Sequence, residues 1–266
     1  MKASDFSLTV LGSRGSMAFC GSLTSRYGGD SSCYMVRAGE ETIFLDAGTG
    51  IAAAPADCPR PPVVLLSHLH LDHIVGLGVF PCLVHKGWHT RIFVPFCADR
   101  QSAEAALEYV FSPPYWPLRL TEYAGHPRLL PLPDRLTLGE VSVDAIPGNH
   151  PGGCMVYRLT YHGKTIVYAT DYEYEPKSFE RLIAFSRDVD LLLFDSQYTE
   201  PELLKKAGFG HASAEKGLEL MRCSGAKRLL LIHHDPQSLD HILALRERAF
   251  TGKKVELART GQCIEL

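Results

Sequence analysis

The strongest constraint on this chain is a short apolar run that ends directly in a cluster of metal-binding side chains. Residues 63–67 follow two prolines and carry no charge, which is typical of a central strand buried on both faces. His68, His70, Asp72 and His73 then form an H-x-H-x-D-H pattern. Zinc, iron and manganese accept imidazole and carboxylate ligands, and burying such groups without a charge partner would be costly. The pattern therefore predicts a metal site on the loop after this strand.

The rest of the chain alternates between short strands and helices. With 266 residues and 45% apolar content it can bury a large core, and we expect a single domain over residues 1–266. The expected strands are residues 6–11, 33–38, 41–46, 63–67, 91–96, 141–146, 155–161, 165–170, 190–195 and 228–233. The expected helices are residues 72–79, 102–109, 176–185, 213–223 and 236–250. This order predicts an α/β fold in which two sheets pack face to face with helices outside.

One long segment has no periodicity of either kind. Residues 112–133 are rich in proline and aromatic side chains. We expect an irregular loop there, and such a loop is either functional or a packed crossover between the sheets.

Composition and charge count against several classes of protein. The net charge of −3 and the pI of about 6.5 give no global basic field for binding nucleic acid or anionic membranes. No stretch approaches the roughly 20 apolar residues that a membrane span needs. Residues 1–6 lack the basic and then apolar build of a signal peptide, so we expect a cytoplasmic protein.

The eight cysteines form no C-x-x-C pair. This spacing argues against a thiolate zinc knuckle and against a redox dithiol, and it favours free thiols in a reducing compartment. Cys33 and Cys154 lie close in sequence to the expected site loops, so each stays open as an extra metal ligand.

The metal-binding pattern resembles that of the metallo-β-lactamase superfamily, within which the ribonuclease Z-like and cyclic phosphodiesterase branch fits best. A glycine-rich opening at residues 27–32 and the D-x-G string at Asp46 resemble the same family, and the resemblance extends from Leu11 to Pro236. It implies a four-layer αββα sandwich of two mixed β-sheets with outer helices. It also implies that Asp46 accepts a hydrogen bond near the ligand loop, whereas an ordinary turn aspartate is the alternative.

The resemblance implies a dinuclear metal centre. His150, after a strand, would complete a three-histidine site with His68 and His70, and Asp171 would bridge both metals. The second metal would be held by Asp72, His73 and His233. His233 and His234 are adjacent, and strand alternation sends their side chains to opposite sides, so only one should bind. We choose His233 because the family's last ligand directly follows the apolar run, which leaves His234 as an outer or substrate contact.

Two further residues are candidates for contact with the substrate. In ribonuclease Z-like proteins a histidine in a His-Ser-Thr string contacts the phosphate and helps the leaving group. His211 matches it, although the string here is His-Ala-Ser. We assign a catalytic role to His211 and also to the ligand Asp72. Arg14, in the first loop, is either a phosphate clamp or a solvated arginine.

These implications together predict a metal-dependent hydrolase. Two divalent ions, with zinc expected and manganese or iron as alternatives, would activate a shared hydroxide for attack on a small or cyclic phosphodiester. Ribonuclease Z enzymes grip tRNA with a long basic arm, whereas the segment between Asp171 and His211 has no room for one. They also carry glycine where this chain has Leu71. A long nucleic acid and a membrane are therefore not expected as partners, and a homodimer stays open.

Three alternatives to a phosphodiesterase stay open. The same hydroxide could hydrolyse a carbonyl ester, lactone, thioester or β-lactam. Other members of this fold are iron-dependent redox proteins, and others would be binding or biosynthesis-accessory proteins without turnover. The complete set of expected ligands counts against the accessory role.

Overall fold

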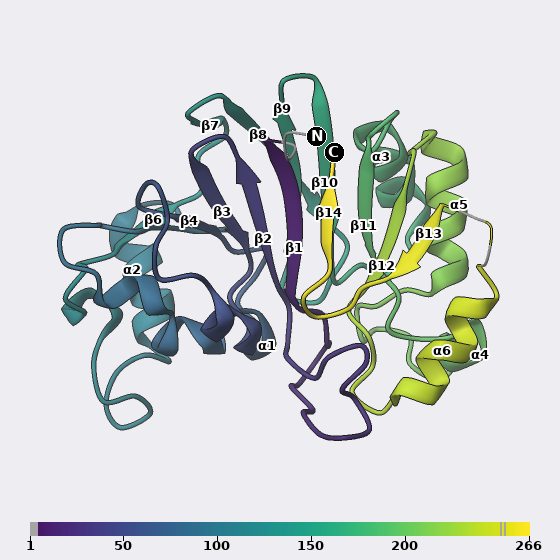
Figure 1. Ribbon diagram of the computed structural model, residues 1–266, viewed down its shortest axis with the longest axis horizontal. Coiled ribbons are helices and arrows are strands. Elements are labelled where there is room, and N and C mark those ends of the chain that lie inside the picture. The colour runs from purple at the N-terminus through teal and green to yellow at the C-terminus, as the bar shows by residue number, and fades with distance from the viewer. Residues whose placement is uncertain (1–4, 251, 253) are drawn as a thin grey trace.

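Two seven-stranded sheets pack face to face, and helices cover their outer faces (Figure 1). The computed structural model describes residues 5–250, 252 and 254–266. We expected no signal peptide from residues 1–6. Of these residues, 1–4 lie outside this part of the chain. The arrangement confirms the predicted αββα sandwich of two mixed sheets. In the described residues, no helix is both long and apolar enough to cross a bilayer.

The first sheet has the strand order β14-β1-β2-β3-β4-β5-β6. Strands β14 to β3 pair antiparallel, and β3 to β6 pair parallel. Its strands are β1 (Phe6–Gly12), β2 (Cys33–Ala38), β3 (Glu41–Leu45), β4 (Val63–Leu65), β5 (Arg91–Val94), β6 (Arg128–Pro131) and β14 (Cys263–Glu265).

The second sheet has the order β13-β12-β11-β10-β9-β8-β7. Strands β7 to β10 pair antiparallel, and β10 to β13 pair parallel. Its strands are β7 (Leu136–Leu138), β8 (Val141–Gly148), β9 (Cys154–Tyr161), β10 (Lys164–Ala169), β11 (Leu191–Asp195), β12 (Leu229–Ile232) and β13 (Val255–Leu257).

Helices lie between these strands in the chain. The α-helices are α1 (Leu71–Ile74), α2 (Arg100–Glu108), α3 (Pro176–Phe185), α4 (Glu200–Leu203), α5 (Ala214–Ser224) and α6 (Asp240–Arg248). Short 3₁₀ helices are η1 (Thr49–Ala53), η2 (Val75–Val79), η3 (Pro81–Val84) and η4 (Leu120–Glu122). The helix expected over residues 72–79 is therefore an α-helical turn followed by η2. Gly76 and Gly78 fall in η2, where glycine weakens a continuous α-helix.

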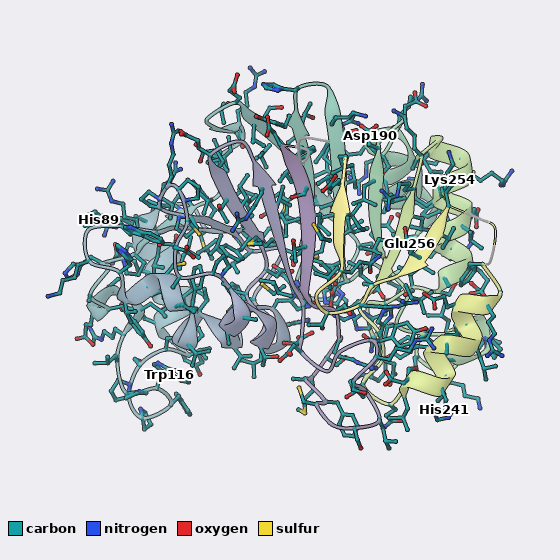
Figure 2. All side chains as sticks on the ribbon, viewed as in Figure 1. His89, Trp116, Asp190, His241, Lys254 and Glu256 are labelled. Carbon is teal, nitrogen blue, oxygen red and sulfur yellow. The ribbon has the colours of Figure 1, made fainter. Side chains whose placement is uncertain are left out.

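Apolar side chains fill the space between the two sheets (Figure 2). Leu8 and Leu65 of the first sheet share one buried cluster with Leu159 and Leu193 of the second. Burying such side chains is the main favourable contribution to folding, at about 1.5–3 kcal/mol each. Because both sheets contribute to one core, we propose that the chain forms a single domain.

The prediction of an irregular loop over residues 112–133 was only partly correct. It contains η4, and its end forms β6, which pairs parallel to β5. Pro131 is the last residue of β6, a place that proline tolerates because β6 is an edge strand.

The loops that matter for function lie at one end of the sandwich. Parallel strands point the same way, so the carboxyl ends of β3 and β4 meet at one edge of the first sheet and those of β10, β11 and β12 at one edge of the second. In Figure 1, α1 and the loop that follows β1 lie at this end, away from the labelled chain termini.

Candidate metal centre

Three histidines gather on one side of the centre. His68 and His70 come from the loop after β4, and His150 comes from the loop after β8. His150 Nε2 is 3.1 Å from His70 Nδ1. One ligand atom from each of these residues and from Asp171 lies within 4.8 Å of the others. This spacing suits nitrogen and oxygen ligands around a single ion.

A second group lies next to the first. His73 Nε2 is 3.1 Å from Asp72 Oδ2 and 3.2 Å from His233 Nε2. His233 follows β12, so β12 and the turn at α1 supply this group from opposite sheets. Asp72 is also held from outside the centre, because its Oδ2 accepts a hydrogen bond from the backbone N–H of Ser16 at 2.8 Å.

Asp171 lies between the two groups. Its Oδ1 is 3.2 Å from His73 Nε2 and 3.1 Å from His233 Nε2. Its Oδ2 faces the other group, at 3.6 Å from His68 Nε2 and 3.8 Å from His150 Nε2. One buried carboxylate therefore directs one oxygen toward each cluster.

Outer hydrogen bonds hold the imidazoles in place. His150 Nδ1 is 2.8 Å from the carbonyl oxygen of Gly210, and His68 Nδ1 is 3.0 Å from Ser67 Oγ. Such contacts fix the tautomer and leave Nε2 free to face inward. His68 Nε2 is buried and has no hydrogen-bond partner among the described residues. A buried nitrogen without a partner is costly, and a metal ion would satisfy it.

Asp46 anchors the other side of the centre. Its buried carboxylate accepts hydrogen bonds from the Ser67 N–H at 2.6 Å, the Ser67 hydroxyl at 2.7 Å and the Tyr168 hydroxyl at 2.6 Å. Its Oδ2 is also 2.6 Å from His73 Nδ1. A carboxylate behind a histidine in this way orients the ring and raises its basicity.

The charges of the site also fit bound cations. Burial lowers the pKa of His68, His70 and His150, which favours the neutral imidazole that a metal needs. Burial opposes charge on His73 as well, but the carboxylates of Asp171, Asp72 and Asp46 raise its pKa well above the ordinary value. The buried carboxylates of Asp171, Asp72 and Asp46 thus favour positive charge at this centre.

Comparison with known proteins identifies the family. The family model described as "Beta-lactamase superfamily domain" matches residues 41–234, which include both clusters. The chain belongs to the metallo-β-lactamase superfamily. It is therefore a metallo-hydrolase with a site for divalent metal.

Curated relatives agree with this membership. The chain is 25% identical over 244 residues to the probable metallo-hydrolase YhfI of Bacillus subtilis, covering 87% of this chain and 91% of YhfI. It is also 25% identical over 243 residues to ribonuclease BN of Cronobacter sakazakii, covering 71% and 77% of the two chains.

Solved structures of the superfamily share the fold. The crystal structure of YhfI superposes with a TM-score of 0.74 at 22% identity and covers 98% of this chain and 99% of its own. A diphosphatase from the PhnP family superposes with a TM-score of 0.70 at 18% identity and covers 98% of both chains.

His211 lies beside this superfamily site with a partner that the sequence analysis missed. His211 Nδ1 is 2.9 Å from Asp195 Oδ2, and its ring stacks on that of His233 at 4.9 Å between centroids. Burial opposes charge on His211, but the Asp195 carboxylate, followed by Asp171, raises its pKa. Asp195 closes β11, between the strands that lead to Asp171 and His233, and this position could have identified it.

His234 and Arg14, the two candidates for an outer or substrate contact, are both buried. His234 is 1% exposed and its Nε2 is 3.0 Å from the Ala258 carbonyl oxygen, and burial lowers its pKa to about 3. Arg14 is fully buried, and its guanidinium donates to the carbonyl oxygens of Gly28, Asp235 and Ser238. Both side chains hold the backbone together and neither is available to a substrate.

The cysteines left open as ligands do not join the metal clusters either. Cys33 and Cys154 are fully buried, and burial raises the pKa of both thiols well above the ordinary value. Among the described residues, neither thiol belongs to a group of side chains spaced to hold a metal ion. The Cys154 thiol instead donates to the carbonyl oxygen of Thr170 at 3.5 Å.

Proposed function

We propose that this metallo-hydrolase binds two divalent ions and cleaves a small or cyclic phosphodiester. The observation that carries this proposal is the position of Asp171, whose two carboxylate oxygens face different clusters. The first ion would be held by His68, His70 and His150, and the second by Asp72, His73 and His233. Zinc suits this set of nitrogen and oxygen ligands, as do manganese and iron.

The protein's own residues divide the remaining tasks. Two divalent ions, when bound, would supply an activated water and stabilise charge on a phosphoryl group. Asp46 and Gly210 orient the ligands His73 and His150. Asp195 orients His211 through Nδ1, so that Nε2 can deliver a proton to the departing oxygen.

The segment between Asp171 and His211 favours a small substrate. This segment consists of α3, β11 and the short α4, and it holds no long basic arm. Hydrolysis of RNA is the second candidate, because one relative is named ribonuclease BN. We favour a small phosphodiester because the net charge of −3 offers little attraction to a polyanion.

Exposed apolar side chains surround the proposed site. Leu71 lies between two ligands and is 59% exposed, and Phe209 adjoins Gly210 and is 63% exposed. Phe96 is 60% exposed, and a Cβ atom at Gly153 would lie only 3.0 Å from its ring. Exposed apolar groups beside a site favour an apolar substituent on the substrate over a chain of phosphates.

A substrate panel with the purified metal-loaded protein tests this function. The panel contains bis(p-nitrophenyl) phosphate, cyclic nucleotides, a precursor tRNA, nitrocefin and a homoserine lactone, with the D171N variant as control. We expect turnover of the small phosphodiesters and its loss in D171N. Turnover of only the lactone and nitrocefin would overturn the phosphodiester assignment in favour of carbonyl chemistry, and preferential cleavage of the tRNA would favour a ribonuclease.

A further inference from the structure

Two cysteines that are distant in the sequence meet on one carbonyl oxygen. Cys58 follows η1, and Cys82 lies in η3. The Cys58 thiol is 3.9 Å from the carbonyl oxygen of Pro55, and the Cys82 thiol is 3.4 Å from the same atom. Cys82 belongs to the buried apolar cluster against which Cys58 packs. Both sulfur atoms therefore contact the same oxygen atom.

Cys58 has the properties of an attacking cysteine, and Cys82 has those of a resolving cysteine. Cys58 is partly exposed, whereas Cys82 is fully buried. The hydrogen bond from Cys82 lowers the pKa of Cys58 to about 7, against the effect of burial. The same hydrogen bond and burial raise the pKa of Cys82. A partly exposed thiol with a lowered pKa is the one that meets an oxidant first.

We propose that Cys58 and Cys82 form a reversible intramolecular disulfide, a modification site independent of the proposed function. Cys58 thiolate would attack glutathione disulfide, forming a mixed disulfide and releasing one glutathione. The Cys82 sulfur would then attack the Cys58 sulfur, break the bond to glutathione and pass its proton to the departing thiolate. In sum, two protein thiols are oxidised and one glutathione disulfide is reduced to two glutathiones.

The position of this pair gives the disulfide a structural consequence. A bond between Cys58 and Cys82 would close a loop that contains β4 and the whole H-x-H-x-D-H motif. Closing such a loop restricts the unfolded chain and stabilises the folded one. The absence of a C-x-x-C pair led us to expect no redox dithiol, but the fold brings together cysteines that the sequence separates.

Mass spectrometry after equilibration in glutathione redox buffers tests the proposal. The full-length metal-loaded protein is alkylated, weighed and digested. We expect two cysteines fewer to be alkylated than in the reduced protein, and a peptide that joins Cys58 to Cys82. C58S should form no such link, C82S should retain glutathione on Cys58, and C223S, which removes an exposed cysteine, should behave as the wild type.

Thermal unfolding gives a second readout. The oxidised wild type should unfold at a higher temperature than the reduced protein, and C58S should show no such difference. The proposal would be overturned if both thiols of the wild type stayed reduced while Cys223 was modified. It would also be overturned if wild-type Cys58 accumulated stable glutathione. C58S replaces a partly exposed thiol, so it keeps the test valid if the buried C82S variant does not fold.

Discussion

The carboxylate of Asp46 lies 2.6 Å from Nδ1 of His73, on the side of the ring away from the proposed metal. Both residues are fully buried, and the same carboxylate accepts hydrogen bonds from Ser67 and Tyr168. The ligand loop after β4 is therefore fastened to the end of β3 and to β10 in the opposite sheet.

This contact predicts that D46N weakens metal binding. The amide would lose the negative charge that fixes the His73 ring, and we expect metal affinity to fall about 10–100-fold. Competition with a chromogenic chelator measures the loss. Y168F, which removes one donor to Asp46 but leaves the contact with His73, is the matched control. Equal affinities for D46N and Y168F would contradict this role of Asp46.

His211 is expected to act on the leaving group. We predict that H211A lowers kcat by about 10²–10⁴-fold for substrates with poor alkyl leaving groups. Loss of kcat should be much smaller for p-nitrophenyl esters, whose leaving group needs no proton. D195N should show the same pattern in weaker form because it only loosens His211. An equal loss of kcat for both leaving groups, measured with unchanged metal content, would rule out proton donation.

Glu173 is expected to position His150 indirectly, because it holds the loop at residues 208–210 that contacts His150. Its carboxylate accepts hydrogen bonds from the N–H groups of Gly208 at 2.7 Å and Gly210 at 3.0 Å, and the Gly210 carbonyl oxygen faces His150. E173Q replaces one acceptor with a donor, and we expect kcat to fall roughly tenfold, which corresponds to about 1.4 kcal/mol. Steady-state kinetics would show this loss. The exposed Glu180 of α3 supplies the control E180Q, and matching kcat values for the two variants would count against the prediction.

Asp190, which directly precedes β11, is expected to make the stability of the protein depend on pH. In Figure 2 it lies on the same side as Lys254 and Glu256, with which it lines one pocket. Burial works against its charge, but hydrogen bonds from Lys227 Nζ at 2.8 Å and the Thr165 N–H at 2.8 Å lower its pKa.

Because the folded state lowers this pKa, ionised Asp190 stabilises the protein above the unfolded value of roughly 3.9, and the effect is lost as the pH falls below it. Denaturant titration should show D190N less stable than the wild type by about 1–2 kcal/mol at pH 7, with a smaller difference near pH 2. D144N, at an exposed position of β8, should change little at either pH. A difference for D190N that does not depend on pH would refute the assignment.

Those strands and ligands that are marked by a pattern of neighbouring residues could be predicted from the sequence. The apolar runs of β4 and β12 end directly at ligand-type residues, and the residue chemistry at those ends pointed to metal. Strands β7, β13 and β14 were missed because three residues are too few to show a period of two.

Other parts depend on contacts that no local pattern encodes. Arg14 was expected at a surface or a site, but it is buried because carbonyl groups from the loops at Gly28 and Ser238 surround it. Asp195 was missed because an aspartate at a strand end is common, and its importance comes only from its contact with His211. The H-x-H-x-D-H motif separates Cys58 from Cys82 in the sequence, yet both thiols contact the carbonyl oxygen of Pro55.

The number and position of bound metals test the central claim most directly. Crystals of the zinc-loaded wild type would be measured at the zinc absorption edge, together with elemental analysis of the same protein. We predict two anomalous peaks per chain, one among His68, His70 and His150 and one among Asp72, His73 and His233, with Asp171 between them. A single peak, or peaks away from these side chains, would contradict the account.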